Sequence, residues 1–176
     1  MLCFTDGIPT IIDLLRIDNE NIQAVTLAVL CNMTENPPVC EALSAVDAGS
    51  ILIRLLESPD CDVQSRSAVV LADLASLESM RQLIRETGGI ASLVRLLESS
   101  FEDVLIHAVD ALRVVCAGGH DAQTDVGQSG AIPPMVEFLS VTSGMYACNG
   151  TYQCVCLSVC MYACNGTYHI CMNLCM

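Results

Sequence analysis

The chain contains no lysine and no tryptophan, and only 4% of its 176 residues are aromatic. Its seven basic residues are all arginines, against 20 acidic residues, which gives a formal net charge of -13. Without a polybasic tract, and with so acidic a surface, the chain is not expected to bind nucleic acid or anionic lipid directly. Apolar residues make up 53% of the chain, but polar residues interrupt every run well short of the roughly 20 that a membrane-spanning helix needs. We therefore expect no nucleic-acid partner and no membrane span.

The residue patterns of common enzyme sites are missing as well. None of the three histidines belongs to a His-Glu-x-x-His pattern, and the glycine pairs at 88–89 and 118–119 are not followed by the Lys-Ser/Thr of a phosphate-binding loop. The cysteines of the first 139 residues are dispersed, with no neighbouring histidine to activate a thiolate. These absences predict a protein that is not an enzyme and holds no cofactor or metal. Residues 1–6 also lack the features of a secretory signal, which favours the cytoplasm and leaves the nucleus open.

What the chain does have is one apolar signature repeated four times. The copies cover residues 11–15, 52–56, 93–97 and 135–139, and their last leucines are 41, 41 and 42 residues apart. Two further sets keep the spacing of 41: Ile22, Val63 and Val104, and Leu30, Leu71 and Leu112. A unit of this length is too small to bury its own apolar face, so the period predicts a stacked array in which neighbouring units supply the core.

Proline, glycine and serine breaks divide each period into a short, a medium and a long helix. We expect helices near residues 37–45, around 52–56, and near 62–76, 79–86, 90–98, 102–116 and 121–127. In the first long helix, an apolar stripe is predicted from the three-, four- and seven-residue steps among Ile22, Val25, Val29 and Leu30. The equivalent stripe in the second unit comprises Val63, Val70, Leu71 and Leu74.

Three segments carry a family resemblance. Residues 88–97 and 130–139 resemble the second helix of an armadillo repeat, and residues 21–33 resemble its third helix. Period, helix order and glycine positions agree with this family over residues 1–139. The resemblance implies an all-α fold, an armadillo-type right-handed helical solenoid, whose third helices line a concave surface that binds other proteins.

The best-known peptide-binding pattern of that family is largely absent. Members of the nuclear-import and catenin type hold extended peptides with a Trp and an Asn four residues apart on the third helix. In successive units of this chain the Asn position holds Asn32, Asp73 and Val114, and the Trp position holds Ala28, Val69 and Asp110. The amide of Asn32 could still pair with a peptide backbone, because it donates and accepts at once. It could equally be a polar residue at a helix end.

The expected function is therefore a non-enzymatic protein-interaction scaffold without the import-receptor mode. Six residues of the third helices are the candidate partner-binding residues: Asn32, Arg66, Asp73, His107, Asp110 and Arg113. Two carboxylates on the concave side, those of Asp73 and Asp110, would suit a basic or amphipathic helical partner. The alternative is that these acids only keep a repeat protein soluble.

The C-terminal segment has a different composition. Residues 138–176 contain no charged side chain but seven of the twelve cysteines, and the octapeptide at 145–152 recurs unchanged at 161–168. Such a duplication is low complexity. We predict that residues 140–176 form a disordered tail beside the repeats of residues 1–139, and that the tail arose from a translated non-coding repeat. The cysteine spacings fit a zinc site poorly, so metal binding or redox chemistry in this tail is a third functional reading.

The repeat pattern begins at a second helix and ends after one, which leaves two complete units between partial ones. This arrangement favours a fragment or truncated isoform of a longer protein, either a scaffold, a competitor of that protein, or a nonfunctional product. It also predicts marginal stability and self-association through uncapped ends. The side chains expected to be exposed are Ile8, Ile11, Ile12 and Leu15 at one end, and Ile132, Met135 and Phe138 at the other.

Overall fold

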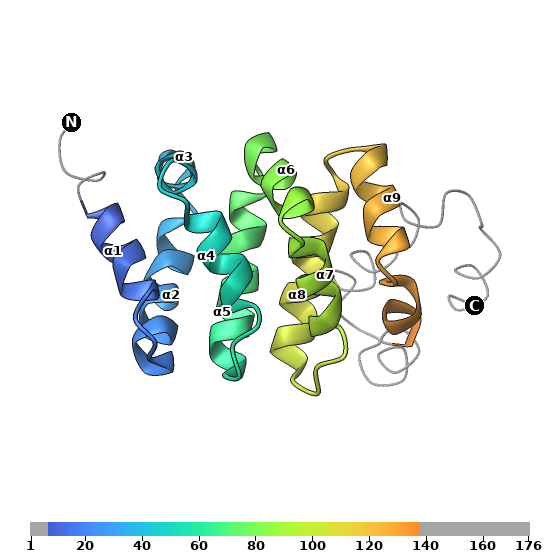
Figure 1. Cartoon of the computed structure of the whole chain (residues 1–176), viewed down its shortest axis with the longest axis horizontal. Coiled ribbons are helices and arrows are strands. Elements are labelled where there is room, and N and C mark those ends of the chain that lie inside the picture. The colour runs from blue at the N-terminus through green and yellow to red at the C-terminus, as the bar shows by residue number, and fades with distance from the viewer. Residues whose placement is uncertain (1–6, 138–176) are drawn as a thin grey trace.

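The computed structural model describes residues 7–137, and the part of the chain it describes contains helices but no strands. The helices stand side by side in one row, and the chain advances along that row from α1 to α9 (Figure 1). They are α1 (Ile8–Leu15), α2 (Glu20–Met33), α3 (Pro37–Ser44), α4 (Ala48–Leu55), α5 (Cys61–Leu74), α6 (Glu78–Glu86), α7 (Gly89–Leu96), α8 (Glu102–Cys116) and α9 (His120–Gln128). Residues 132–137 are helical too.

The order of short, medium and long helices is confirmed. The second unit consists of α3, α4 and α5, and the third of α6, α7 and α8. Their bounds lie within two residues of those predicted, except that α4 begins at Ala48, four residues before the helix expected around residues 52–56. The turn between the short and the medium helix uses a left-handed residue in three units: Asp47 (φ 56°), Gly88 (φ 80°) and Gly130 (φ 83°). Glycine adopts this conformation freely, and aspartate does so when its short side chain forms a local hydrogen bond. At Asp47 the carboxylate accepts a 2.7 Å hydrogen bond from the Ser50 hydroxyl.

The long helices form the centre of the stack. Helix α5 packs against α2 on one side and α8 on the other. The stripe predicted for α5 is confirmed, because Val63, Val70, Leu71 and Leu74 are all fully buried. At its C-terminal end, the Arg81 guanidinium donates to the carbonyls of Ala75 (2.6 Å) and Ser76 (3.0 Å). Groups that a helix end leaves unpaired are satisfied in this way.

The stripe predicted for the first long helix is wrong in three of its four members. Only Leu30 is buried, and the buried face of α2 consists of Gln23, Thr26, Leu27 and Leu30. Gln23 can be buried because its amide donates to the carbonyls of Leu15 (3.4 Å) and Ile17 (2.8 Å). The other three members, Ile22, Val25 and Val29, are exposed by 36%, 67% and 46%.

The side chains expected at the uncapped ends are also mostly buried. Helix α1 turns Ile8, Ile12 and Leu15 into the core, where they are at most 2% exposed, and Ile11 is half-buried. Near the last described residue, Met135 is fully buried and Ile132 half-buried. Phe138 and the predicted tail lie outside the described residues. At the first end, the prediction failed because α1 packs its apolar face against α2, the long helix of its own unit.

Candidate protein-binding surface

The six candidate residues lie on the three long helices, and all are at least partly exposed. We call the accessible sides of α2, α5 and α8 the long-helix surface. Electrostatic interactions connect its units: Asp73 of α5 interacts with Asp110 of α8 and with Glu35, which follows α2. The fold therefore brings carboxylates from three successive units close enough to influence one another.

Asp73 is the central carboxylate of this surface. It lies in the last turn of α5, and one of its oxygens accepts a 2.5 Å hydrogen bond from the Thr34 hydroxyl at the end of α2. Burial raises the pKa of Asp73, and the charges of Asp110 and Glu35 raise it further, although the Thr34 hydrogen bond acts in the opposite direction. In the described residues no arginine forms an ion pair with Asp73.

The arginines of the long-helix surface pair with acids of their own helix. Arg113 donates to Asp110 one turn earlier, with nitrogen to oxygen distances of 2.9 Å and 2.8 Å. Arg66 lies 3.8 Å from Asp62, and both side chains are well exposed. Such exposed pairs contribute little energy. Arg66 and Arg113 offset the charges of Asp62 and Asp110, and they leave the charge of Asp73 uncompensated.

His107 joins two helices. Its Nδ1 atom lies 2.7 Å from the Ser65 hydroxyl oxygen, so the pair links α8 to α5. Burial lowers the pKa of His107, while Asp103 and Asp110 act to raise it. We therefore interpret His107 as a flank residue that holds the surface together. Asn32 differs, since its exposed amide forms no side-chain hydrogen bond with the described residues.

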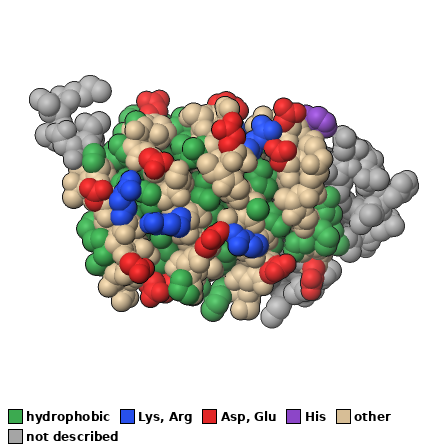
Figure 2. Space-filling model, viewed as in Figure 1, with side chains coloured by type: hydrophobic (Ala, Val, Ile, Leu, Met, Phe, Trp, Pro, Cys, Tyr) green, Lys and Arg blue, Asp and Glu red, His purple; other side chains and the backbone are tan. Residues whose placement is uncertain are grey.

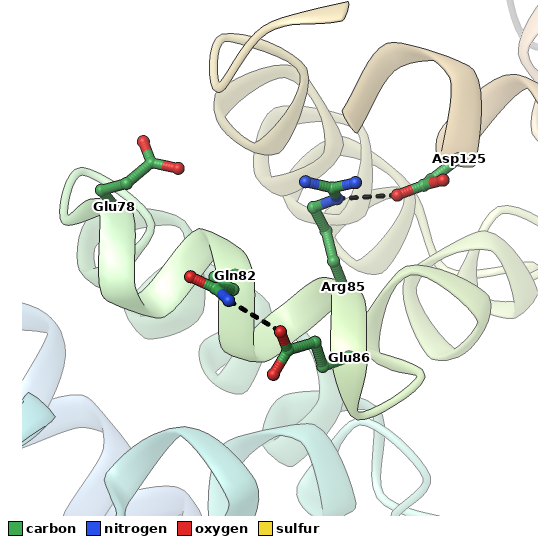
Figure 3. A pocket seen from close by; sticks show the side chains of 5 residues that line it. All are labelled: Glu78, Gln82, Arg85, Glu86 and Asp125. Carbon is green, nitrogen blue, oxygen red and sulfur yellow. Dashed lines mark hydrogen bonds and ion pairs between the residues drawn. The ribbon is translucent and has the colours of Figure 1, made fainter. Parts of the chain in front are cut away.

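A shallow depression lies outside this surface, between α6 and α9 (Figure 3). It measures about 300 Å³, and its lining is polar: Glu78, Gln82, Arg85, Glu86 and Asp125. Gln82 donates to Glu86 at 2.8 Å and Arg85 to Asp125 at 2.7 Å, as the dashed lines in the figure mark. The hydrogen bond that Arg85 donates to the Asp125 carboxylate raises the pKa of Arg85. With these groups already paired, the depression offers a ligand little that is unsatisfied.

Charged side chains of both signs share the surface of the molecule (Figure 2). Figure 2 shows acidic and arginine side chains interspersed over the visible face of the molecule.

Burial raises the pKa of the thiols of Cys31 and Cys40, and that of Cys116 to about 11, so these thiols stay protonated at neutral pH. Within residues 7–137 no group of three metal-ligating side chains is placed to hold an ion. No helix of that region is long and apolar enough to cross a membrane.

Known proteins share the repeat. The sequence model of the Armadillo/beta-catenin-like repeat matches residues 78–117, which cover α6, α7 and α8 as one unit. The human ankyrin and armadillo repeat-containing protein is 35% identical over 123 residues. The chain belongs to the armadillo-repeat family. That alignment covers 69% of this armadillo chain but 8% of the human protein. Kinesin-like protein KIN-UA of Arabidopsis thaliana is 43% identical over 66 residues, covering 38% of this chain and 7% of the relative.

Solved structures show the same fold. Computationally designed armadillo repeat proteins for modular peptide recognition match with a TM-score of 0.78 at 21% identity, covering 96% of this chain and 69% of theirs. A designed armadillo repeat protein in complex with the peptide (KR)4 matches with a TM-score of 0.74 at 24% identity, covering 90% of this chain and 64% of its own. The armadillo-type right-handed helical solenoid expected from the sequence is thereby confirmed.

Proposed function

We propose that this armadillo-repeat chain is a non-enzymatic scaffold that binds a basic peptide segment across α2, α5 and α8. The observation that carries the proposal is the carboxylate of Asp73. It is partly buried, lies near Glu35 and Asp110, and is approached by a hydroxyl rather than by an arginine. Like charges held together in this way repel one another, and a cation from a ligand would relieve the repulsion.

Each candidate residue has a part in this proposal. Asp73 and Asp110 pair with lysine or arginine side chains of the ligand, and the exposed amide of Asn32 hydrogen-bonds its backbone. Two arginines border the acidic centre, Arg66 and Arg113, and hold their own acids in place. His107 keeps α8 in register with α5 through Ser65. The designed protein solved with (KR)4 supports the chemistry, since a basic peptide suits an armadillo surface there.

A titration of the full chain with fluorescently labelled (KR)4 tests the proposal. Saturable binding should weaken by about tenfold in Asp73→Asn, because a hydrogen bond to a charged group contributes roughly 1.5–3 kcal/mol. Asp13→Asn is the matched control, since it removes the same charge from an exposed site on α1. Equal weakening in both variants would indicate attraction by net charge alone and would sink the proposal.

A competing truncated isoform remains the alternative suggested by the sequence. Such an isoform would bind the same peptide as the matching segment of the human relative, so the two proteins would displace one another from that peptide. A nonfunctional isoform would show no saturable binding. We place the scaffold in the cytoplasm, and we set the boundary between repeats and tail at residues 139 and 140. Both are predictions from the sequence, and the tail's metal or redox chemistry falls outside the described residues.

A further inference from the structure

Exposed apolar side chains gather at the first two helices. We call Ile22, Val25 and Val29 the α2 face; their side chains are 36%, 67% and 46% exposed. At about 100° per residue, these three fall within about 60° of arc on one side of the helix. Leu14 and Ile17, just before α2, are exposed by 39% and 43%. Among the described residues, the other large apolar side chain this open is Phe101 at 56%.

The repeat itself shows what covers such a face. Ile22 and Val29 flank Val25 in the α2 face, and their equivalents in the next two units are at most 1% exposed. These equivalents are Val63 and Val104 for Ile22, and Val70 and Ala111 for Val29. In those units the face belongs to a long helix packed against the long helix before it, α5 on α2 and α8 on α5. The central position, Val25, corresponds to Arg66 and His107 in the next two units, and both are only partly exposed. There too the long helix before is in contact, since the Arg66 carbonyl accepts from Cys31 and His107 lies against Ser65. The α2 face thus resembles a surface that packs against another long helix, and in α2 alone its centre is apolar.

We propose that the α2 face is the contact between two copies of this chain, packed antiparallel across a two-fold axis near Val25. The spacing of the stripe is nearly symmetric, because Val25 follows Ile22 by three residues and precedes Val29 by four. In an antiparallel pair, Ile22 of one copy meets the partner's Val29. A two-fold contact places the same patch on both sides, and this patch is complementary to itself.

Charge favours the same pairing. With a net charge of -13, most contacts between two copies of the chain would bring carboxylates together. Helix α2 carries one charged residue, Glu20, in its first turn. On the helical wheel this residue lies about 140° or more from every member of the α2 face. The apolar stripe therefore lets two acidic copies meet without facing charges.

The size of the face sets the strength of the contact. Helix α2 has 14 residues, so it is about 21 Å long at 1.5 Å per residue. Two helices in contact over this length bury less than the roughly 800 Å² per partner of a stable interface. The dimer should accordingly be weak and should depend on protein concentration in the micromolar range.

Sedimentation velocity on the full chain tests the contact. A reducing agent is kept present so that none of the 12 cysteines links copies covalently. The mass should rise from one copy towards two between about 1 and 500 µM, the range of weak interfaces. Val25→Glu should shift this transition at least tenfold to higher concentration. Phe101→Glu is the matched control, since it adds the same charge at an exposed apolar side chain away from α2 and should dimerise like the unaltered chain.

A charge exchange tests the two-fold axis. If Val25 lies near that axis, Val25→Glu and Val25→Lys should each be monomeric alone, because like charges then face one another. Their equimolar mixture should dimerise at least as well as the unaltered chain. A monomer at all concentrations, an unaffected Val25→Glu variant, a monomeric mixture or open-ended growth beyond two copies would each overturn the proposal. Dimerisation is measured without peptide, and (KR)4 binding is tested at Asp73, which lies on α5 and outside the α2 face, so failure of either proposal leaves the other standing.

Discussion

Thr34, which ends α2, donates a 2.5 Å hydrogen bond to the carboxylate of Asp73 near the end of α5. The two residues are 39 positions apart and belong to successive armadillo units. This bond fixes the central acid of the long-helix surface in place. A substitution at Asp73 that keeps this hydrogen bond can change the affinity for a ligand without changing the stability of the fold. The two properties can therefore be measured separately.

Asp73→Asn should weaken peptide binding without weakening the fold. Burial and neighbouring acids raise the pKa of Asp73 above its usual value of 3.8. A carboxyl with a raised pKa in the fold contributes stability below the unfolded pKa and loses that contribution as the pH rises through the folded pKa. At pH 7 the neutral amide, which can still accept from Thr34, should leave the free energy of unfolding unchanged or about 0–1 kcal/mol higher, after solvent screening. Urea unfolding at pH 7 measures this. A loss above about 1 kcal/mol would show that the ionised carboxylate stabilises the fold.

Acidification should destabilise the fold through His107. Its pKa is lowered in the fold, so the unfolded chain takes up its proton first, near the ordinary value of 6.5. The stability contributed by the neutral imidazole is therefore fully present above pH 6.5 and is lost as the pH falls from there through the folded pKa. His107→Gln should flatten this part of the curve between about pH 7.5 and 5. Unfolding measured across that range compares the two proteins, and parallel curves would rule out His107 as the source.

Removing the hydroxyl of Ser67 should stabilise the fold. This hydroxyl is fully buried in α5 and has no hydrogen-bond partner among the described residues. The third unit already has alanine at the equivalent position, Ala108, which is equally buried. Because an unpaired buried polar group costs about 1–3 kcal/mol, Ser67→Ala should raise the free energy of unfolding by about 1 kcal/mol. Ser65→Ala is the control: it should lower stability, since it strips His107 of its 2.7 Å partner.

Gly49→Ala should destabilise the stack even though alanine favours helices. A Cβ atom at Gly49 would lie 2.3 Å from Leu83 and 2.5 Å from Met80, two side chains of α6 that pack against α4. Both atoms are side-chain ends that could turn aside, but Met80 is buried and must displace its own neighbours to do so. Overpacking in a filled core costs about 1–3 kcal/mol, which exceeds the roughly 1 kcal/mol that alanine contributes in a helix interior. Gly7→Ala serves as the control, because no atom lies within 4 Å of its added Cβ. A melting temperature of Gly49→Ala at or above that of the unaltered chain would mean that the Met80 and Leu83 side chains turn aside at little cost.

Much of this architecture could be predicted from the sequence, because a 41-residue period constrains every unit at once. The helix order and the buried stripe of α5 followed from it. The α2 stripe did not, since periodicity identifies an apolar face but not whether a neighbour covers it. Glu35 was missed because it precedes Asp73 by 38 residues, off the period. The Ser65 to His107 contact depends on how α5 and α8 pack, which spacing alone does not give.

The most direct test of the scaffold is an exchange of charge across the long-helix surface. Full chain and the double variant Asp73→Arg, Asp110→Arg are each titrated with (KR)4 and with an acidic peptide of equal length, at low salt and at about 0.15 M salt. We predict that the unaltered chain binds the basic peptide alone, and that the double variant loses it by at least about tenfold and gains the acidic one. If the double variant, folded by its circular dichroism, bound (KR)4 as tightly as the unaltered chain does, the long-helix surface would not be the binding site.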